Sequence, residues 1–348
     1  MNFAERFHGN RGVKISNRVD SDESDNFLQF LQQMGVECCY AWIKPEQEQY
    51  DFIAKLKERT EKYGLRLFNL GSEKYAKPFS VHRGLPDRDE YIEGFNNFMR
   101  LLGRVGVPTT TITWESQHAY ATSPDGAVVR PPHSQFQTTT RGGAPTRMYD
   151  DRAVDADPLS AEIKLTKDQT WANFEYFIKA AIPAAEESKV RICLHPNDPP
   201  VDSCLGVATL IETIHDYRRA FAMAGSDYLG MEFCCGCWLE GGVHGFGDIF
   251  AGIREFVEAG RVSIVHFRNV SGTLPYFIET FIDGGYQDMY CLMKEFVKAG
   301  YDGTMIYDHS PEMSTGLAAQ TAFAVGYMKA LRRAAEDETL CVQLAHGH

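Results

Sequence analysis

Apolar and polar positions follow two spacings that alternate along the chain. Short apolar runs rich in β-branched residues are typical of buried strands, and the charged stretches between them are typical of amphipathic helices. The pattern predicts strands at 36–42, 65–70, 107–113, 190–194, 228–233, 262–267 and 304–307. It predicts helices at 47–63, 88–105, 167–187, 205–222, 248–259, 286–299 and 316–333. Glycines that commonly end helices stand shortly before the next strand, at Gly35, Gly64, Gly106, Gly260 and Gly300.

The number of strand–helix units indicates the fold class. A short, polar strand near 2–7 brings the count to eight, and with 348 residues this predicts an α/β protein with a (β/α)8 TIM barrel. A doubly wound open sheet is the alternative, but no glycine-rich phosphate loop follows an early strand. We expect a single barrel domain over 1–335 and a C-terminal tail over 336–348.

A long irregular stretch at 114–166 interrupts the alternation after the predicted fourth strand. So long a loop inside a compact domain is usually functional or disordered. Because it follows a strand, it belongs to the face of the barrel that carries active sites, and we expect a lid or a dimer contact. A solvated surface insertion is the alternative.

Composition narrows the classes of function. The hydrophobic content of 44% allows a large core, and the formal net charge of −12 disfavours nonspecific binding to nucleic acid or anionic membranes. We find no apolar segment long enough to span a bilayer and no apolar core of a secretory signal near the amino terminus. Nine cysteines, with adjacent pairs at 38–39 and 234–235 that are awkward for disulfides, favour a reduced, cytoplasmic protein.

Four metal-binding side chains end four consecutive predicted strands: His195, Cys234, His266 and Asp308. Each alone has a structural explanation, such as a hydrogen-bonded histidine or a buried thiol. Together they would converge on one rim of a parallel barrel, and their mixture of nitrogen, sulfur and oxygen suits a borderline transition metal better than calcium or magnesium. Alternation lets only one of Cys234 and Cys235 point inward, and Cys237 is a third candidate.

The same segments resemble those of the mannonate dehydratases, metal-dependent TIM-barrel enzymes that convert D-mannonate to 2-keto-3-deoxygluconate. That family carries a His-Pro-Asp-Asp-Pro-Pro segment, a Cys-x-Gly strand end, a His-x-Arg-Asn-Val strand and an Asp-His strand end. This sequence matches all four, with Asn197 in place of one aspartate. The resemblance implies that His195, Cys234, His266 and Asp308 bind the metal, that His309 is catalytic and that Arg6 faces the substrate.

The sequence also departs from the family. A catalytic tyrosine in a Gly-Leu-Tyr-Asp-Arg stretch has no counterpart here, since this chain reads Gly316-Leu-Ala318-Ala-Gln320. Tyr307, Tyr276 and Tyr327 are candidate replacements. Because of this departure the sequence does not identify the substrate, and a different sugar acid or a keto sugar is an alternative to D-mannonate.

The residues that remain support a mechanism. Dehydration of a 2,3-dihydroxy acid needs a base for the α-hydrogen and an acid for the departing hydroxide, and we expect one Mn²⁺ or Fe²⁺ per chain to stabilise the charge that develops. His309 would be the general acid or base, and Arg268 and Arg6 would pair with the substrate carboxylate. A structural ion pair is the alternative for Arg268. Weaker candidates near the site are His118, His133, Arg141, Trp42 and Trp114.

Three functions are compatible with these residues. The first is a hydro-lyase that dehydrates D-mannonate or a related aldonate to a 2-keto-3-deoxy acid. The second is a metal-dependent sugar isomerase or epimerase that works through an enediol, and the third is a silent paralogue that senses a metabolite. We expect a small-molecule sugar acid as partner and neither nucleic acid nor membrane, and the resemblance implies a homodimer.

Overall fold

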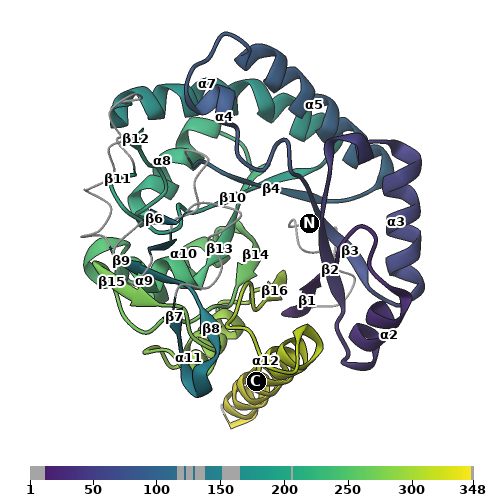
Figure 1. Cartoon of the computed structure of the whole chain (residues 1–348), viewed down its shortest axis with the longest axis vertical. Helices are drawn as coiled ribbons and strands as arrows, with labels where there is room; N and C mark the ends of the chain where they lie inside the picture. Colours follow the sequence, from purple (N-terminus) through teal and green to yellow (C-terminus); the bar gives the residue numbers. More distant parts are fainter. Residues whose placement is uncertain are drawn as a thin grey trace.

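The computed structural model contains a closed barrel of eight parallel strands surrounded by helices (Figure 1). The structure describes residues 12–115, 121–122, 128–129, 138–150, 165–204 and 207–345. The strands run, in barrel order, β1 (Lys14–Arg18), β16 (Thr304–Ile306), β14 (Val262–His266), β13 (Leu229–Cys234), β10 (Arg191–His195), β4 (Thr109–Thr113), β3 (Arg66–Ser72) and β2 (Cys38–Ile43). The predicted TIM barrel is confirmed.

The helices lie outside the strands, as the amphipathic pattern requires. They are α2 (Asp25–Gln33), α3 (Tyr50–Lys62), α4 (Phe79–His82), α5 (Arg88–Val105), α7 (Lys167–Ser188), α8 (Ile214–Ala224), α9 (Cys235–Gly245), α10 (Ile249–Glu258), α11 (Met289–Lys298) and α12 (Leu317–Ala345). Gly106 shows how a helix stops: its φ of +81° is a left-handed conformation that glycine adopts without steric cost, and its amide donates back to Leu102.

The predicted position of the first strand and the predicted start of one helix were wrong. The first barrel strand is Lys14–Arg18 and not 2–7, which lies outside the described residues. The strand was missed because Ser16 and Asn17 are buried polar residues, so it lacks an apolar run. The helix predicted at 205–222 begins only at Ile214, where Thr213 caps its first turn.

The last helix is longer than predicted. It continues to Ala345 instead of ending at Arg333, so the domain boundary expected at 335 falls inside α12. Residues 333–345 contain neither glycine nor proline and are rich in alanine and other helix formers, so nothing in the sequence stops the helix.

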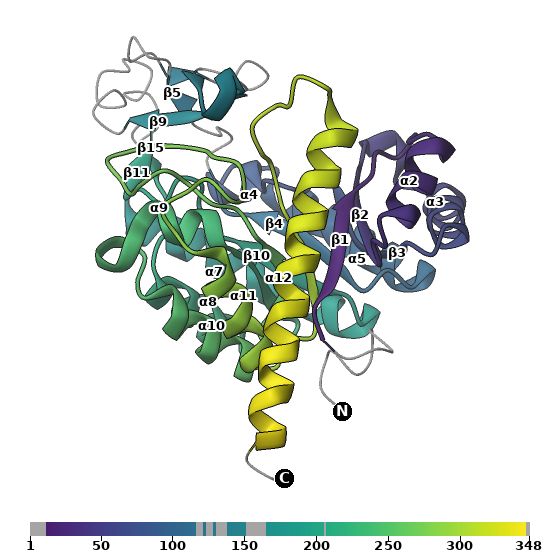
Figure 2. The ribbon, with the colours of Figure 1, turned by 90° about the horizontal axis from the view of Figure 1, so that it is seen from below.

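The insertion does follow the fourth barrel strand, β4, and part of it joins a second loop. Its strand β9 (Met148–Asp150) pairs antiparallel with β15 (Tyr276–Ile278), which lies in the connection after β14. Figure 2 shows β9 and β15 together at one end of the barrel, while α12 runs along the side of the barrel toward the other end. Two segments far apart in sequence thus form one small sheet at that end.

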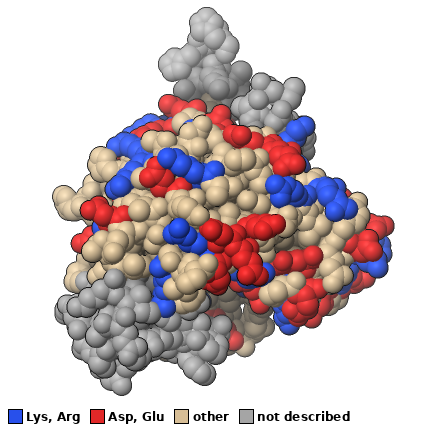
Figure 3. All heavy atoms as spheres, turned by 90° about the horizontal axis from the view of Figure 1, so that it is seen from above, with Lys and Arg blue, Asp and Glu red and all other residues tan. Residues whose placement is uncertain are grey.

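The surface charge and the length of the helices can be compared with the expectation that the chain binds neither nucleic acid nor a membrane. On the face drawn in Figure 3, acidic side chains form the larger areas and basic side chains are interspersed among them, in line with the net charge of −12. Within the described residues, no helix combines the length and the apolar character needed to cross a membrane.

A buried histidine gives the fold a measurable response to acid. The His82 ring is 0% exposed, packs 5.5 Å from the ring of Trp114, and has no hydrogen-bond partner for either nitrogen among the described residues. Burial lowers the pKa of His82 from 6.5 to about 4. Between these two values the unfolded chain binds more protons than the folded chain, so the free energy of unfolding falls as the pH drops.

We therefore expect His82→Leu to remove part of the loss of stability on going from about pH 7.5 to about pH 5, by up to about 2 kcal/mol. Urea unfolding at both pH values measures this difference. The control is His215→Leu, at an exposed position. This variant should lose as much stability between the two pH values as the wild type does. Equal acid sensitivity of wild type and His82→Leu would contradict the prediction.

Candidate active site

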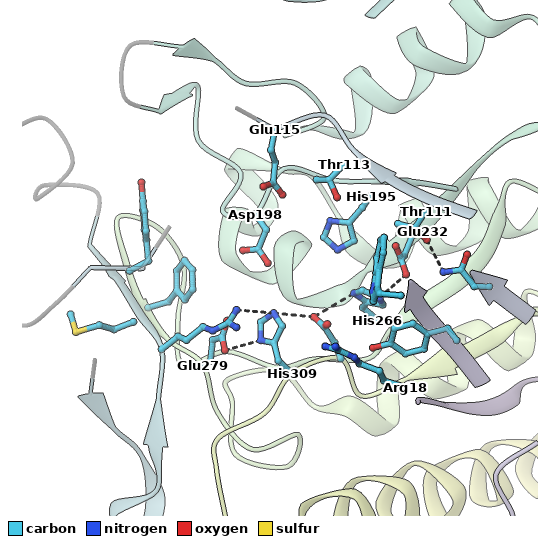
Figure 4. Close-up of a pocket in the computed structure, with 18 residues that line it drawn as sticks. Arg18, Thr111, Thr113, Glu115, His195, Asp198, Glu232, His266, Glu279 and His309 are labelled. Carbon is cyan, nitrogen blue, oxygen red and sulfur yellow. Dashed lines mark hydrogen bonds and ion pairs between the residues drawn. The ribbon is translucent and has the colours of Figure 1, made fainter. Parts of the chain in front are cut away.

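A cavity of about 250 Å³ lies at the carboxyl ends of the barrel strands (Figure 4). Every barrel strand, or the residues directly after it, contributes to its wall. The remaining wall comes from the insertion and from the loop that contains β15. The lining residues are Arg18, Tyr40, Trp42, Asn69, Thr111, Thr113, Glu115, Arg147, Met148, Tyr149, His195, Asp198, Glu232, His266, Phe277, Glu279, Asp308 and His309.

The structure brings the predicted metal donors together. Ligand atoms of His195, Cys234 and His266 all lie within 4.8 Å of one another, and all three residues are buried. Asp308 Oδ2 lies 3.4 Å from His266 Nδ1. The cause is the barrel register, because β10, β13 and β14 are neighbours and Cys234 pairs directly with His266. Of the three cysteine candidates, only Cys234 belongs to this cluster.

Local contacts prepare His195 and Cys234 for binding a cation. His195 Nδ1 lies 2.7 Å from the carbonyl oxygen of Pro196, so a proton donated there leaves the lone pair on Nε2. Burial by itself would raise the pKa of the Cys234 thiol. Hydrogen bonding with Cys237, the charge of Arg268 and hydrogen bonding with both histidines instead hold that pKa well below its usual range. A thiolate is the form of cysteine that binds metals.

Asp308 and His266 complete the cluster. Asp308 has a φ of +60°, a left-handed conformation that is uncommon outside glycine and is often found at functional sites. Burial opposes the charge of the carboxylate, but the charges of His266 and His309 lower the pKa of Asp308. His266 Nδ1 is buried without a hydrogen-bond partner among the described residues. This orphaned atom and the mixed donor set fit a transition-metal ion.

His309 stands next to the donor cluster and is held by a carboxylate. Its Nδ1 lies 2.8 Å from Glu279 Oε2, and its Nε2 lies 3.3 Å from Asp308 Oδ2 and 3.5 Å from Arg147 Nη1. Donation of the Nδ1 proton to Glu279 leaves a lone pair on Nε2. His309 can therefore accept a proton at Nε2.

The insertion holds Glu279 in place. The Glu279 amide donates to the carbonyl of Arg147 at 3.0 Å, and the Thr146 hydroxyl donates to the carbonyl of Glu279 at 2.9 Å. Burial opposes the ionised carboxylate, but the charges of His309, Arg147 and Arg268 lower the pKa of Glu279 to about 2. The insertion thus orients the carboxylate that orients His309.

Arg268 does not lie where a substrate carboxylate could reach it. Its side chain is 1% exposed and does not line the cavity. The guanidinium lies 2.9 Å from Asp198, 2.8 Å from Glu240, 2.9 Å from Glu279 and 3.3 Å from Asp308. The prediction from the sequence that Arg268 contacts the substrate is therefore wrong. The alternative, a structural ion pair, is correct.

The arginine also explains a glycine of the Cys-x-Gly segment. A Cβ on Gly236 would clash with the Arg268 guanidinium, and the Sγ atoms of Cys234 and Cys237 lie 3.6 and 3.7 Å from Arg268 Nη2. The glycine gives the guanidinium room to reach both sulfur atoms.

Of the other site residues proposed from the sequence, few of those that the structure describes lie at the cavity. Arg6, His118 and His133 lie outside the described residues, and Arg141 pairs with Asp283 away from the cavity. Trp42 lines the cavity, whereas Trp114 is packed against Phe174 and Phe177. None of the candidate replacement tyrosines lines it; Tyr307, for example, has its hydroxyl on Thr321.

Sequence reasoning missed several cavity residues: Arg18, Tyr40, Arg147, Tyr149, Glu232 and Glu279. One of them left a signal. Glu232 stands two residues before Cys234 on the same strand, so alternation sends both side chains to the same face. Arg147 and Glu279 lie in irregular segments where no periodicity applies.

Fold and site together define a parallel-barrel protein with a histidine, thiolate and carboxylate cluster at the active rim. The family model for D-mannonate dehydratase (UxuA) matches residues 148–337, more than half of the chain. The chain belongs to that family of hydro-lyases, so the sequence-based expectation of a mannonate dehydratase-like enzyme is confirmed.

Individual relatives agree with this assignment. The mannonate dehydratase of Thermotoga maritima is 28% identical over 283 residues, which cover 75% of this chain and 77% of the relative. That of Streptococcus suis is 26% identical over 276 residues, which cover 74% and 73%. The crystal structure of mannonate dehydratase from Streptococcus suis serotype2 superposes with a TM-score of 0.77 at 20% identity, over 94% of this chain and 96% of the other. An L-ribulose 3-epimerase structure shares the fold with a TM-score of 0.59 at 12% identity, over 95% and 98%.

The burial of Arg268 predicts a large effect of its removal on stability. Arg268→Met should lower the free energy of unfolding by about 3–5 kcal/mol, because it leaves four buried or partly buried carboxylates without their common partner. Urea unfolding of metal-free protein measures the loss.

Arg254→Met is the matched control, because Arg254 forms a half-exposed pair with Glu295. Arg254→Met should lower the free energy of unfolding by about 1 kcal/mol or less. A similar loss in the free energy of unfolding for the two variants would contradict the prediction, because the buried guanidinium would then contribute no more to stability than a surface one.

Proposed function

We propose that this chain is a metal-dependent hydro-lyase that dehydrates D-mannonate or a related aldonate to a 2-keto-3-deoxy acid. The observation that carries the proposal is the convergence of His195, Cys234, His266 and Asp308 beside His309 at the carboxyl ends of the strands of a mannonate dehydratase-family barrel. A homodimer and a reduced cytoplasmic setting are further expectations, from the family resemblance and from the cysteine content.

The four donors would hold Mn²⁺ or Fe²⁺. When bound, a divalent ion polarises substrate oxygens and stabilises the negative charge that develops beside the carboxylate. Two imidazoles, a thiolate and a carboxylate suit such borderline ions. Arg268 supports this set, since its guanidinium contacts both Cys234 and Asp308.

His309 is the proposed proton-transfer group. His309 lines the cavity, and with its Nδ1 proton held by Glu279 its Nε2 can accept a proton from the substrate or return one to the leaving hydroxyl. Glu279 keeps the ring in this orientation and stabilises its charged form once Nε2 has been protonated.

The substrate carboxylate needs a cation that the cavity exposes. Arg18 and Arg147 both line the cavity, and a guanidinium binds a carboxylate through two parallel hydrogen bonds. These two residues replace Arg268 in the proposed substrate contacts. Met148, Tyr149 and Phe277 lie on the β9–β15 sheet and would reduce the access of water above the reacting carbons.

A substrate panel tests the proposal. Protein loaded with Mn²⁺ or Fe²⁺ should form a 2-keto-3-deoxy acid from at least one aldonate, and the same protein stripped with a chelator should lose this activity and regain it when the metal is restored. Mass spectrometry of the products, which are lighter by one water, detects the reaction.

The panel also separates the alternatives. Aldose–ketose interconversion or epimerisation without loss of water would favour the isomerase, for which the absence of the family tyrosine at Ala318 is the supporting observation. Metabolite binding without any turnover would favour a sensor. Either result would overturn the proposed dehydratase.

Two groups of variants should separate metal binding from proton transfer. Cys234→Ala removes one donor and Asp308→Asn removes the negative charge of another, so metal content after gentle purification should fall well below the roughly one ion per chain expected of the wild type. His309→Asn removes only the proton-transfer nitrogen, so it should keep the metal and lose turnover by at least about 100-fold.

Elemental analysis and the product assay measure these outcomes. Full metal content in both donor variants would contradict the ligand assignment. An active His309→Asn variant would exclude His309 from the mechanism.

A further inference from the structure

Glu232 is a buried carboxylate with no role in the scheme above. It lies on β13, is 3% exposed and lines the cavity from the barrel side. Its Oε1 is 2.6 Å from His266 Nε2, within hydrogen-bonding distance, and Figure 4 shows the two side chains directed toward each other.

The two nitrogens of His266 therefore face different surroundings. Nε2 meets Glu232, while Nδ1 lies on the side of Asp308 and has no hydrogen-bond partner among the described residues. A neutral imidazole carries one proton, and a carboxylate next to Nε2 favours the tautomer with the proton on that nitrogen. The lone pair then stands on Nδ1.

Glu232 also differs from the other carboxylates of the cavity wall. Glu115 pairs with Lys77, and Asp198 and Glu279 pair with Arg268. In the described part of the chain, the ion-pair partner recorded for Glu232 is His266, without a lysine or arginine. A buried carboxylate is stable only with a compensating charge, and a cation bound to His266 would supply it through the ring.

We propose that Glu232 is a positioning residue that accepts the Nε2 proton of His266 and so presents Nδ1 to the metal. The inference rests on the proposed function, because it assumes a metal at this cluster. It implies that the two histidines bind through different nitrogens. His195 uses Nε2, since its Nδ1 is held by the carbonyl of Pro196, and His266 uses Nδ1, since its Nε2 is held by Glu232.

Metal affinity tests the role without an activity assay. The variants are Glu232→Ala, which removes the acceptor, and Glu232→Gln, which keeps a neutral acceptor of the same size. Competition with a chelator should give a Co²⁺ dissociation constant about 10–100-fold higher for Glu232→Ala than for the wild type, with Glu232→Gln between them. The thiolate-to-cobalt charge-transfer band should persist in both variants, because Cys234 remains a ligand.

Glu212→Gln is the matched control. Glu212 is another buried carboxylate that pairs with a side chain, Lys167, but it does not line the cavity. Its substitution should leave the Co²⁺ dissociation constant within about twofold of the wild type. Circular dichroism checks that all variants are folded, and the isosteric Glu232→Gln keeps the test valid if Glu232→Ala unfolds.

Two results would overturn the inference. One is an unchanged Co²⁺ affinity in folded Glu232→Ala or, if that variant unfolds, in Glu232→Gln. The other is X-ray absorption that counts one oxygen donor fewer in the Glu232 variants with both imidazoles still bound, which would make Glu232 itself a ligand. A wild type that binds no metal would instead overturn the proposed function, so the two failures are distinguishable.

Discussion

A single buried guanidinium group joins the parts of this active site. Arg268 contacts a carboxylate from the loop after β10, one from α9, one next to β15 and one after β16, and it reaches two sulfur atoms as well. A charge so deeply buried is stable only when its partners surround it, and each partner is in turn fixed by the arginine. Two of the proposed metal donors, Cys234 and Asp308, contact this guanidinium directly, and His309 is linked to it through Glu279.

The insertion gains its importance through the same network. Its pairing with β15 fixes Glu279, which contacts both Arg268 and His309. The described part of the segment therefore determines the orientation of Glu279, a side chain from the loop that contains β15. Segments distant in sequence meet at this point, which is common at the rim of parallel barrels, where loops carry the chemistry.

The sequence predicted the parts of the molecule that follow regular spacing. Seven barrel strands were found because short apolar runs mark buried strands, and the polar side chains that end these runs indicated the four proposed donors, three of which cluster in the structure. Arg268 was placed wrongly because alternation was extended two residues beyond His266, where β14 has ended and the rule no longer applies. Glu279 and Arg147 could not be predicted, since their positions depend on the pairing of two irregular loops.

Gly236 carries a consequence for how such sequences are compared. A side chain at that position would occupy the volume of the guanidinium, so the glycine of the Cys-x-Gly segment reflects the size of an arginine more than the needs of an ion. In homologues the two positions should covary: loss of the arginine would release the glycine, and any larger residue at the glycine position would signal a rebuilt interior. This pair can mark divergence within the family even where all the donors are retained.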